Sequence, residues 1–151
     1  MENTLHMDLD GGRVVIELKP ELAPQHVERI KQLARTGFYD GIVFHRVIEG
    51  FMAQTGDPTG TGRGGSDLPD LPAEFTKTPF VRGTLGMART ANPDSANSQF
   101  FICFDDAGWL SGQYTVFGQV VSGMEYIDGL ATGEPPAEPD KIVRLAVAAD
   151  A

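Results

Sequence analysis

The chain has 151 residues, of which 41% are hydrophobic and 22% are charged, and its formal net charge is −9. These values are ordinary for a globular domain with a sizeable core, and the negative charge argues against nonspecific binding of nucleic acid, which needs a basic surface. A single cysteine, Cys103, excludes an internal disulfide and a metal site built on paired cysteines. Residues 1–13 do not resemble a signal peptide, and no stretch has the roughly 18 apolar residues of a membrane span. We therefore expect a cytoplasmic protein that does not bind membranes.

A β-hairpin and a helix are the first predicted elements. Apolar residues alternate with polar ones at positions 5, 7 and 9, and again at 14, 16 and 18, on either side of Gly11-Gly12. Half-buried strands of this kind are typical of an antiparallel sheet or barrel. Residues 24–36 then predict a helix that has Pro24 in its first turn and Gly37 as its C-terminal cap. His26, near the start of this helix, is expected to be a solvated surface histidine.

Residues 43–54 predict a strand, a short turn at Gly50 and a second strand. Period-two alternation places Phe44, Arg46 and Ile48 on one face of the first strand. The segment offers the guanidinium of Arg46 and the carboxamide of Gln54, but it contains no evident nucleophile. Taken alone, it is equally consistent with an ordinary hairpin whose arginine is solvated.

A long segment, residues 55–82, is rich in glycine and proline and poor in apolar periodicity. Residues 60–65 match G-x-G-x-x-G, but no helix pattern follows them, so the dinucleotide-binding interpretation is rejected. The spacing of the acidic residues in this segment fits no EF-hand loop, and we expect no metal site. A loop this long inside a compact domain is usually functional.

The last part of the chain predicts strands at 83–88, 97–104, 115–121 and 142–147, and a short helix at 124–130. Residues 99, 101 and 103 share one face of the second of these strands, and residues 100, 102 and 104 share the other. Because both faces are apolar, this strand is expected to be buried on both sides, and Cys103 is expected to be a buried structural thiol. Neither an internal repeat nor a linker interrupts the chain, so residues 1–151 are expected to form a single domain.

Several blocks together resemble the cyclophilins, a family of peptidyl-prolyl cis-trans isomerases. They are Phe44–Gln54, Gly62–Gly65, Gly86–Ala88, Asn97–Ile102, Trp109-Leu110 and Val116–Gly118. The blocks occur in the family's order and span most of the chain, and the loops resemble those of compact bacterial members. The resemblance implies a mainly β fold, a closed eight-stranded antiparallel barrel capped by two helices. The local patterns independently indicate about eight strands and two helices.

The resemblance also implies roles for individual residues and for partners. It implies no cofactor and no metal, a monomer, proline-containing peptides and folding proteins as substrates, and cyclosporin A as a candidate inhibitor. Core packing is the alternative explanation for the apolar members of the implied site. Arg46, Gln54 and Phe51 would be catalytic, and Met52, Gly62, Ala88, Arg89, Thr90, Gln99, Phe101, Trp109, Leu110 and Tyr114 would bind substrate.

These residue types fit the chemistry of an X-Pro bond, whose rotation barrier of about 18–20 kcal/mol reflects amide resonance. A fixed donor such as Arg46 that is aimed at the proline nitrogen would help only in the twisted state, where the nitrogen gains a lone pair. Tyr114 stands where many members carry histidine, and Arg89-Thr90 where many eukaryotic members carry Asn-Ala. Both departures bear on substrate preference.

Two other classes of function remain open at this point. One is a non-catalytic proline-peptide reader or holdase that uses the same groove, although a pure binder would not need Arg46. The other is a barrel that carries a small lipophile, although large residues such as Phe44 and Phe100 favour a filled interior.

Overall fold

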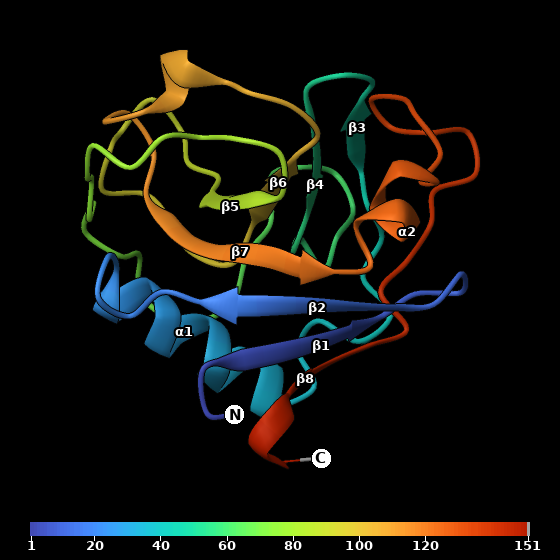
Figure 1. Ribbon diagram of the computed structural model, residues 1–151, viewed down its shortest axis with the longest axis horizontal. Coiled ribbons are helices and arrows are strands. Elements are labelled where there is room, and N and C mark those ends of the chain that lie inside the picture. Colours follow the sequence, from blue (N-terminus) through green and yellow to red (C-terminus); the bar gives the residue numbers. More distant parts are fainter. Residues whose placement is uncertain (151) are drawn as a thin grey trace.

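Eight strands form one antiparallel sheet in the computed structural model, which describes residues 1–150 (Figure 1). From edge to edge the strand order is β3-β4-β6-β5-β7-β2-β1-β8. Neighbours in the sheet are thus mostly strands that lie apart in the sequence. The strands are β1 (Thr4–Asp8), β2 (Arg13–Leu18), β3 (Arg46–Ile48), β4 (Met52–Thr55), β5 (Thr84–Met87), β6 (Phe100–Cys103), β7 (Val116–Ser122) and β8 (Arg144–Val147).

The sheet is an open half-barrel, so the prediction of a closed barrel is wrong. Its edge strands are β3 and β8, and these do not pair with each other in the described chain. Two isolated bridges span the gap instead, between Val47 and Gly133 and between Val43 and Lys141. On its free side the β3 segment thus pairs with residues that precede β8 in the chain, and not with β8 itself.

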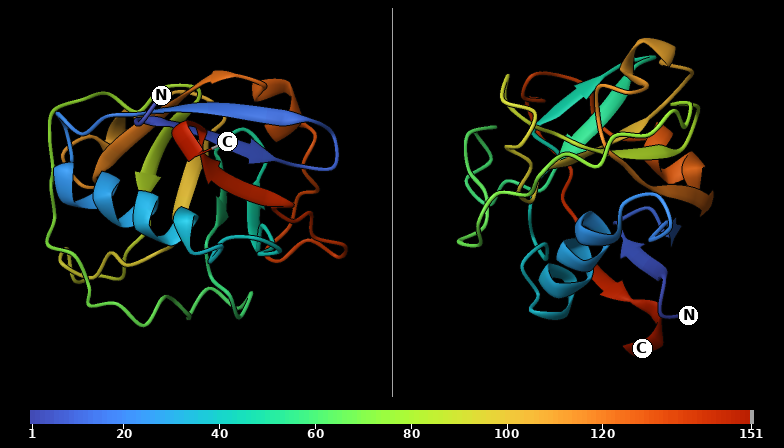
Figure 2. Two further views of the ribbon diagram at one scale, coloured as in Figure 1. Left: turned by 90° about the horizontal axis from the view of Figure 1, so that it is seen from below. Right: turned by 90° about the vertical axis from the view of Figure 1, so that its left-hand side faces the viewer.

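Helix α1 (Pro24–Arg35) packs its apolar face against one side of the sheet, where it contacts β7 and β8 (Figure 2). It ends as predicted, because Gly37 adopts a φ of +75° and its N–H donates to the carbonyl of Ala34 at 3.1 Å. The second helix, α2 (Met124–Asp128), is short, and two 3₁₀ turns, η1 (Gly108–Leu110) and η2 (Ala148–Asp150), complete the fold.

The start of α1 is covered, and the prediction of a solvated His26 is therefore wrong. Glu74 accepts hydrogen bonds from the backbone N–H groups of Gln25 and His26, and its Oε1 lies 2.6 Å from Nδ1 of His26. The imidazole is fully buried. Burial lowers the pKa of His26, and the Glu74 carboxylate offsets this only in part.

Strand β6 separates two hydrophobic clusters, as its double-sided pattern predicted. Phe100 and Ile102 lie in the main core inside the half-barrel, whereas Phe101 and Cys103 lie in a second cluster on the other side of the strand.

The sequence pattern assigned Phe44 to the same face as Arg46 and Ile48, and this prediction is wrong. Phe44 lies in the main core together with Val47. The chain does not enter β3 until Arg46, so the alternation does not extend back to Phe44.

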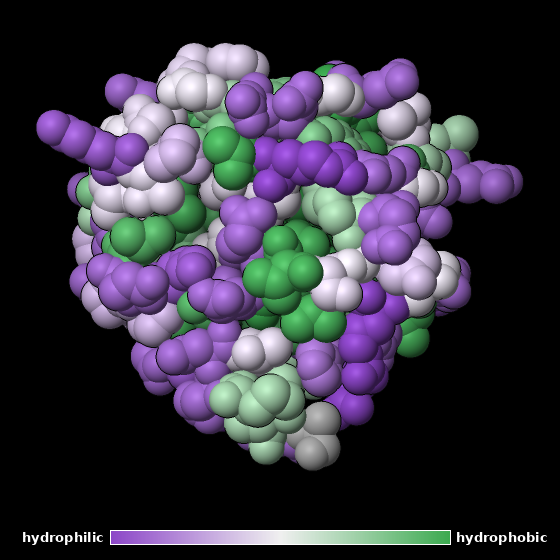
Figure 3. Space-filling model, viewed as in Figure 1, coloured by the Kyte–Doolittle hydropathy of each residue, from purple (hydrophilic) through white to green (hydrophobic). Residues whose placement is uncertain are grey.

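The long segment between Gly56 and Gly83 runs along the outside of the sheet (Figure 2). The view of Figure 3 shows a largely polar surface in which apolar side chains form small islands. No helix within residues 1–150 is long and apolar enough to cross a membrane.

Candidate active site

A small pocket of about 130 Å³ lies against the outer face of β3, β4 and β6. Its base is the ring of Phe101, which stacks on Phe80 with ring centroids 5.9 Å apart and meets Tyr114 edge-on at 5.7 Å. Six of its nine lining residues have apolar or aromatic side chains, which suits a compact ring such as that of proline, and the other three carry polar groups. The lining residues are Arg46, Phe51, Met52, Gln54, Ala88, Arg89, Phe101, Leu110 and Tyr114.

The glycine at position 86 makes room for this base. A Cβ on Gly86 would lie 2.6 Å from Cζ of Phe101 and 2.7 Å from Cε2 of Phe80. Both distances are well inside the van der Waals contact of two carbon atoms, about 3.5–4.0 Å. The close approach of the β5 backbone at Gly86 therefore fixes the position of the Phe101 ring at the base of the pocket.

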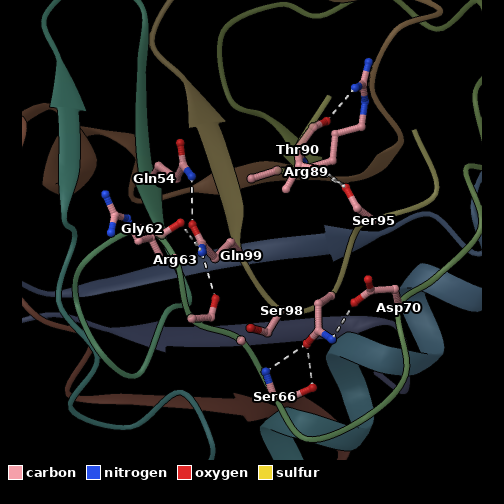
Figure 4. Close-up of a pocket in the computed structure, with 14 residues that line it drawn as sticks. Gln54, Gly62, Arg63, Ser66, Asp70, Arg89, Thr90, Ser95, Ser98 and Gln99 are labelled. Atoms are coloured by element: carbon pink, nitrogen blue, oxygen red, sulfur yellow. Dashed lines mark hydrogen bonds between the residues drawn. The ribbon is translucent and has the colours of Figure 1, made fainter. Parts of the chain in front are cut away.

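A chain of polar side chains holds Arg46 at the edge of the pocket. Nη1 of Arg46 donates to Oε1 of Gln54 at 3.3 Å, and Nε2 of Gln54 donates to Oε1 of Gln99 at 2.9 Å. Gln99 in turn donates to the carbonyls of Gly62 and Gly64 at 3.0 and 2.9 Å (Figure 4). Each carboxamide thus has its orientation fixed on both sides, and the guanidinium is presented to the pocket by a connected network.

Gln54, Ala88 and Arg89 also line a second, larger pocket of about 480 Å³. Gly62, Thr90 and Gln99, to which the family resemblance assigns substrate binding, lie in this second pocket. The two pockets share a wall, so one extended peptide could occupy both. The other residues that line it are Arg63, Gly64, Gly65, Ser66, Asp70, Ser95, Asn97 and Ser98.

Asp57 organises the glycine-rich loop that forms one side of this larger pocket. Its carboxylate is buried and accepts hydrogen bonds from Thr59, from the N–H of Thr61 and from the N–H of Gly62. Burial alone would raise the pKa of Asp57, but the hydrogen bonds from Thr59, Gly64 and Gly62 outweigh it and hold the pKa far below its usual range. The loop that matched a dinucleotide motif is therefore wound around a carboxylate.

The two departures from the family pattern contact each other. Cζ of Arg89 lies 4.6 Å from the ring centroid of Tyr114, a cation–π arrangement. The guanidinium also donates to the backbone carbonyls of Gln113 and Thr90, and Figure 4 shows it pointing away from Gln54 and Gln99. Arg89 and Tyr114 thus hold each other in place on one wall of the small pocket.

Trp109 lines neither pocket. Its side chain is highly exposed, 68% of the residue being accessible, and its ring lies 5.8 Å from that of Phe51. Trp109 is thus an exposed apolar rim residue next to Phe51, which lines the small pocket. Cys103 lies behind the pocket and is buried, which raises the pKa of its thiol to about 12, so it is an inert structural thiol as predicted.

The groove offers donors and apolar surface, and it holds no activated nucleophile among the described residues. His45 is the histidine nearest to Arg46 in sequence, and burial lowers the pKa of its imidazole. No group of three or more His, Cys, Asp or Glu side chains within residues 1–150 is placed to hold a metal ion. The arrangement suits the binding of an extended apolar peptide and the stabilisation of charge by a fixed guanidinium.

Several residues around the site carried no signal in the sequence. Asp57 shapes one side of the larger pocket through hydrogen bonds from Thr59, Thr61 and Gly62. Glu134 lies 2.9 Å from Nε of Arg46, although 88 positions separate the two in the chain. Such contacts depend on the folded path of loops and have no periodic pattern.

The half-barrel carries on its outer face two adjoining pockets and a fixed guanidinium, an arrangement suited to binding an extended peptide. The sequence pattern of the family described as cyclophilin type peptidyl-prolyl cis-trans isomerase/CLD matches residues 4–147. The chain belongs to this family, and its activity is peptidyl-prolyl cis-trans isomerisation.

Relatives and solved structures agree with this assignment. The chain is 54% identical over 165 residues to a probable peptidyl-prolyl cis-trans isomerase of Brucella suis biovar 1 (strain 1330), with 99% of this chain and 84% of that protein covered. It is 43% identical to peptidyl-prolyl cis-trans isomerase B of Bacillus subtilis (strain 168), with 83% and 87% covered.

Among solved structures, the cyclophilin AquaCyp293 from Hirschia baltica superposes with a TM-score of 0.92 at 30% identity, over 99% of this chain and 75% of that one. A cyclophilin type isomerase from Cryptosporidium parvum, crystallised in the presence of the dipeptide Ala-Pro, gives a TM-score of 0.89 at 28% identity. The shares covered are 95% of this chain and 98% of that one.

Proposed function

We propose that Arg46 performs the catalytic step by donating to the proline nitrogen of a twisted X-Pro amide. Rotation removes amide resonance and leaves a lone pair on that nitrogen, so a donor aimed at it stabilises only the transition state. The observation that carries this proposal is the position of Arg46 on the wall of the 130 Å³ pocket, with its guanidinium oriented by Gln54. One tenfold step in rate needs about 1.4 kcal/mol, which a charged hydrogen bond in a preorganised site can supply.

The two pockets would divide the substrate between them. The proline ring would occupy the small pocket over Phe101, between Met52, Leu110 and Tyr114. Gln54 and the backbone near Arg89 would bind peptide carbonyls. Residues that precede the proline would lie in the larger pocket beside Gly62, Ala88, Thr90 and Gln99.

The wider role we propose is that of one domain, residues 1–151, acting as a cytoplasmic monomer on proline-containing peptides and folding proteins. The Ala-Pro dipeptide present with the Cryptosporidium relative supports proline peptides as the substrate class. The exposed Trp109 ring, whose indole N–H makes no hydrogen bond within residues 1–150, supports cyclosporin A as an inhibitor.

Exchange NMR of an X-Pro peptide tests this function directly. With catalytic amounts of the purified protein, the cis and trans signals should broaden, and an added chelator should leave the effect unchanged. Signals that stay sharp would refute it, and so would an effect that the chelator abolishes. Broadening by wild type that an Arg46→Ala variant reproduces in full would refute the role of Arg46 and favour a groove that acts by binding alone.

A further inference from the structure

Arg46 has a second partner, a carboxylate that lines neither pocket. Oε1 of Glu134 accepts a hydrogen bond from Nε of Arg46 at 2.9 Å, while Nη1 of Arg46 donates to Gln54 at 3.3 Å. A planar guanidinium that is held at two of its three nitrogens has little freedom to rotate about its terminal bonds. Within residues 1–150, Nη2 of Arg46 donates to no acceptor, so this is the nitrogen left for a ligand.

The backbone beside Glu134 is tied to the strand that carries Arg46. Gly133 and Val47 exchange two backbone hydrogen bonds of 2.9 Å each, and Val47 directly follows Arg46. Gly133 has a φ of +143°, and a Cβ there would lie 2.6 Å from the backbone of Pro136. The bridge therefore needs glycine at this position, and it fixes the point from which the Glu134 side chain reaches the guanidinium.

Stability is a weak explanation for this ion pair. The side chains of Arg46 and Glu134 are 42% and 58% exposed, and exposed pairs of this kind contribute little to folding. A contact that fixes the plane of a catalytic donor acts on the reaction rate and not on stability. A small misplacement of a catalytic group lowers the rate strongly.

We propose that Glu134 is a positioning residue for the isomerase reaction. Its carboxylate holds Nε of Arg46 so that Nη2 faces the small pocket, and the Val47–Gly133 bridge keeps that carboxylate in place. The inference rests on the catalytic role proposed above for Arg46. It makes the loop of residues 131–141 part of the active-site framework, although this loop contributes nothing to the lining of either pocket.

Three variants test the proposal: Glu134→Ala, Glu134→Gln and the control Glu138→Gln. Glu138 is exposed in the same loop and makes no hydrogen bond or ion pair with the described part of the chain. Glu138→Gln therefore removes one negative charge from the loop without breaking a contact. With Glu134→Ala we expect kcat to fall about five- to tenfold while KM stays within about twofold. Glu134→Gln keeps an oxygen that can accept from Nε, so it should retain about half of kcat or more, and Glu138→Gln should match wild type.

A spectroscopic readout separates positioning from general damage. The Nε–H signal of Arg46 in a ¹⁵N NMR spectrum should be resolved and slow to exchange in wild type and in Glu134→Gln, and lost in Glu134→Ala. The unfolding temperature should change by less than about 2 °C, because the pair is exposed.

Other results would overturn the proposal. An unchanged or higher kcat in Glu134→Ala would mean that the carboxylate is idle or competes with the substrate. Equal losses in Glu134→Gln and Glu138→Gln would mean that charge alone matters. Failure of the underlying function looks different, because then wild type itself would be inactive or Arg46→Ala would be as active as wild type.

Discussion

Replacing Gly86 with alanine should raise KM for X-Pro peptides through a movement of the pocket base. The added methyl would lie 2.6 Å from Phe101 and 2.7 Å from Phe80, so both rings must shift by about 1 Å relative to the β5 backbone to reach ordinary contact. Phe80 is buried, whereas Phe101 borders a cavity of about 130 Å³. The Phe101 ring should therefore yield toward the cavity and reduce the space for proline.

The expected magnitudes follow from the cost of overpacking. An extra methyl in a packed region costs about 1–3 kcal/mol, which for a domain of this size lowers the unfolding temperature by about 3–10 °C. We expect KM to rise at least about tenfold, the equivalent of about 1.4 kcal/mol of lost binding, while kcat changes less because Arg46 stays in place. Thermal unfolding followed by circular dichroism and steady-state isomerisation kinetics would measure both quantities.

Two further variants test this prediction, one as a control and one as a rescue. Gly118→Ala, in β7, is the control, because its Cβ would meet no aromatic ring and approaches its nearest atom at 3.2 Å. Phe80→Leu added to Gly86→Ala should relieve the crowding from behind and recover part of the affinity. A wild-type KM in Gly86→Ala, despite a lower unfolding temperature, would contradict this prediction, since the ring would then have moved away from the pocket.

Other predictions concern the rim and the buried histidine. Trp109→Phe should weaken inhibition by cyclosporin A while kcat/KM for a peptide stays within about twofold, because the ring lies outside both pockets; an unchanged inhibition curve would contradict this. Since the folded state lowers the pKa of His26, stability should be lost as pH falls from about 7 to 5, where the unfolded chain takes up the proton first. His26→Asn should flatten this slope in thermal melts, and an equally steep slope would assign it to other groups. The kcat/KM for an uncharged peptide should meanwhile stay constant from about pH 5.5 to 8.5, because the proposed step moves no proton.

The periodic parts of the fold were predictable from the sequence. The double-sided pattern of β6 correctly assigned Phe100 and Phe101 to opposite faces, because alternation in a central strand is a local property of the backbone. The helix over residues 24–36 likewise followed from its spacing and its terminal glycine. The family resemblance supplied the list of candidate site residues, all of which except Trp109 line one of the two pockets.

Contacts between distant loops were beyond the sequence patterns. His26 is buried because a segment 48 residues away folds over the start of α1, and Glu134 meets Arg46 across 88 residues. Phe44 was assigned to the wrong face because alternation was extended beyond the end of a short strand. The closed barrel failed for a related reason, since closure depends on the length and register of the edge strands β3 and β8.

The central claim, that Arg46 stabilises the twisted amide as an oriented planar donor, is tested most directly by Arg46→Lys. Lysine keeps the positive charge but has neither the planar fork nor the Nε–H that pairs with Glu134. The measurement is kcat/KM for one X-Pro peptide, beside the Kd of the same peptide from titration. We expect a loss of at least about tenfold in kcat/KM with a Kd within about threefold of wild type. Wild-type activity in Arg46→Lys would contradict it.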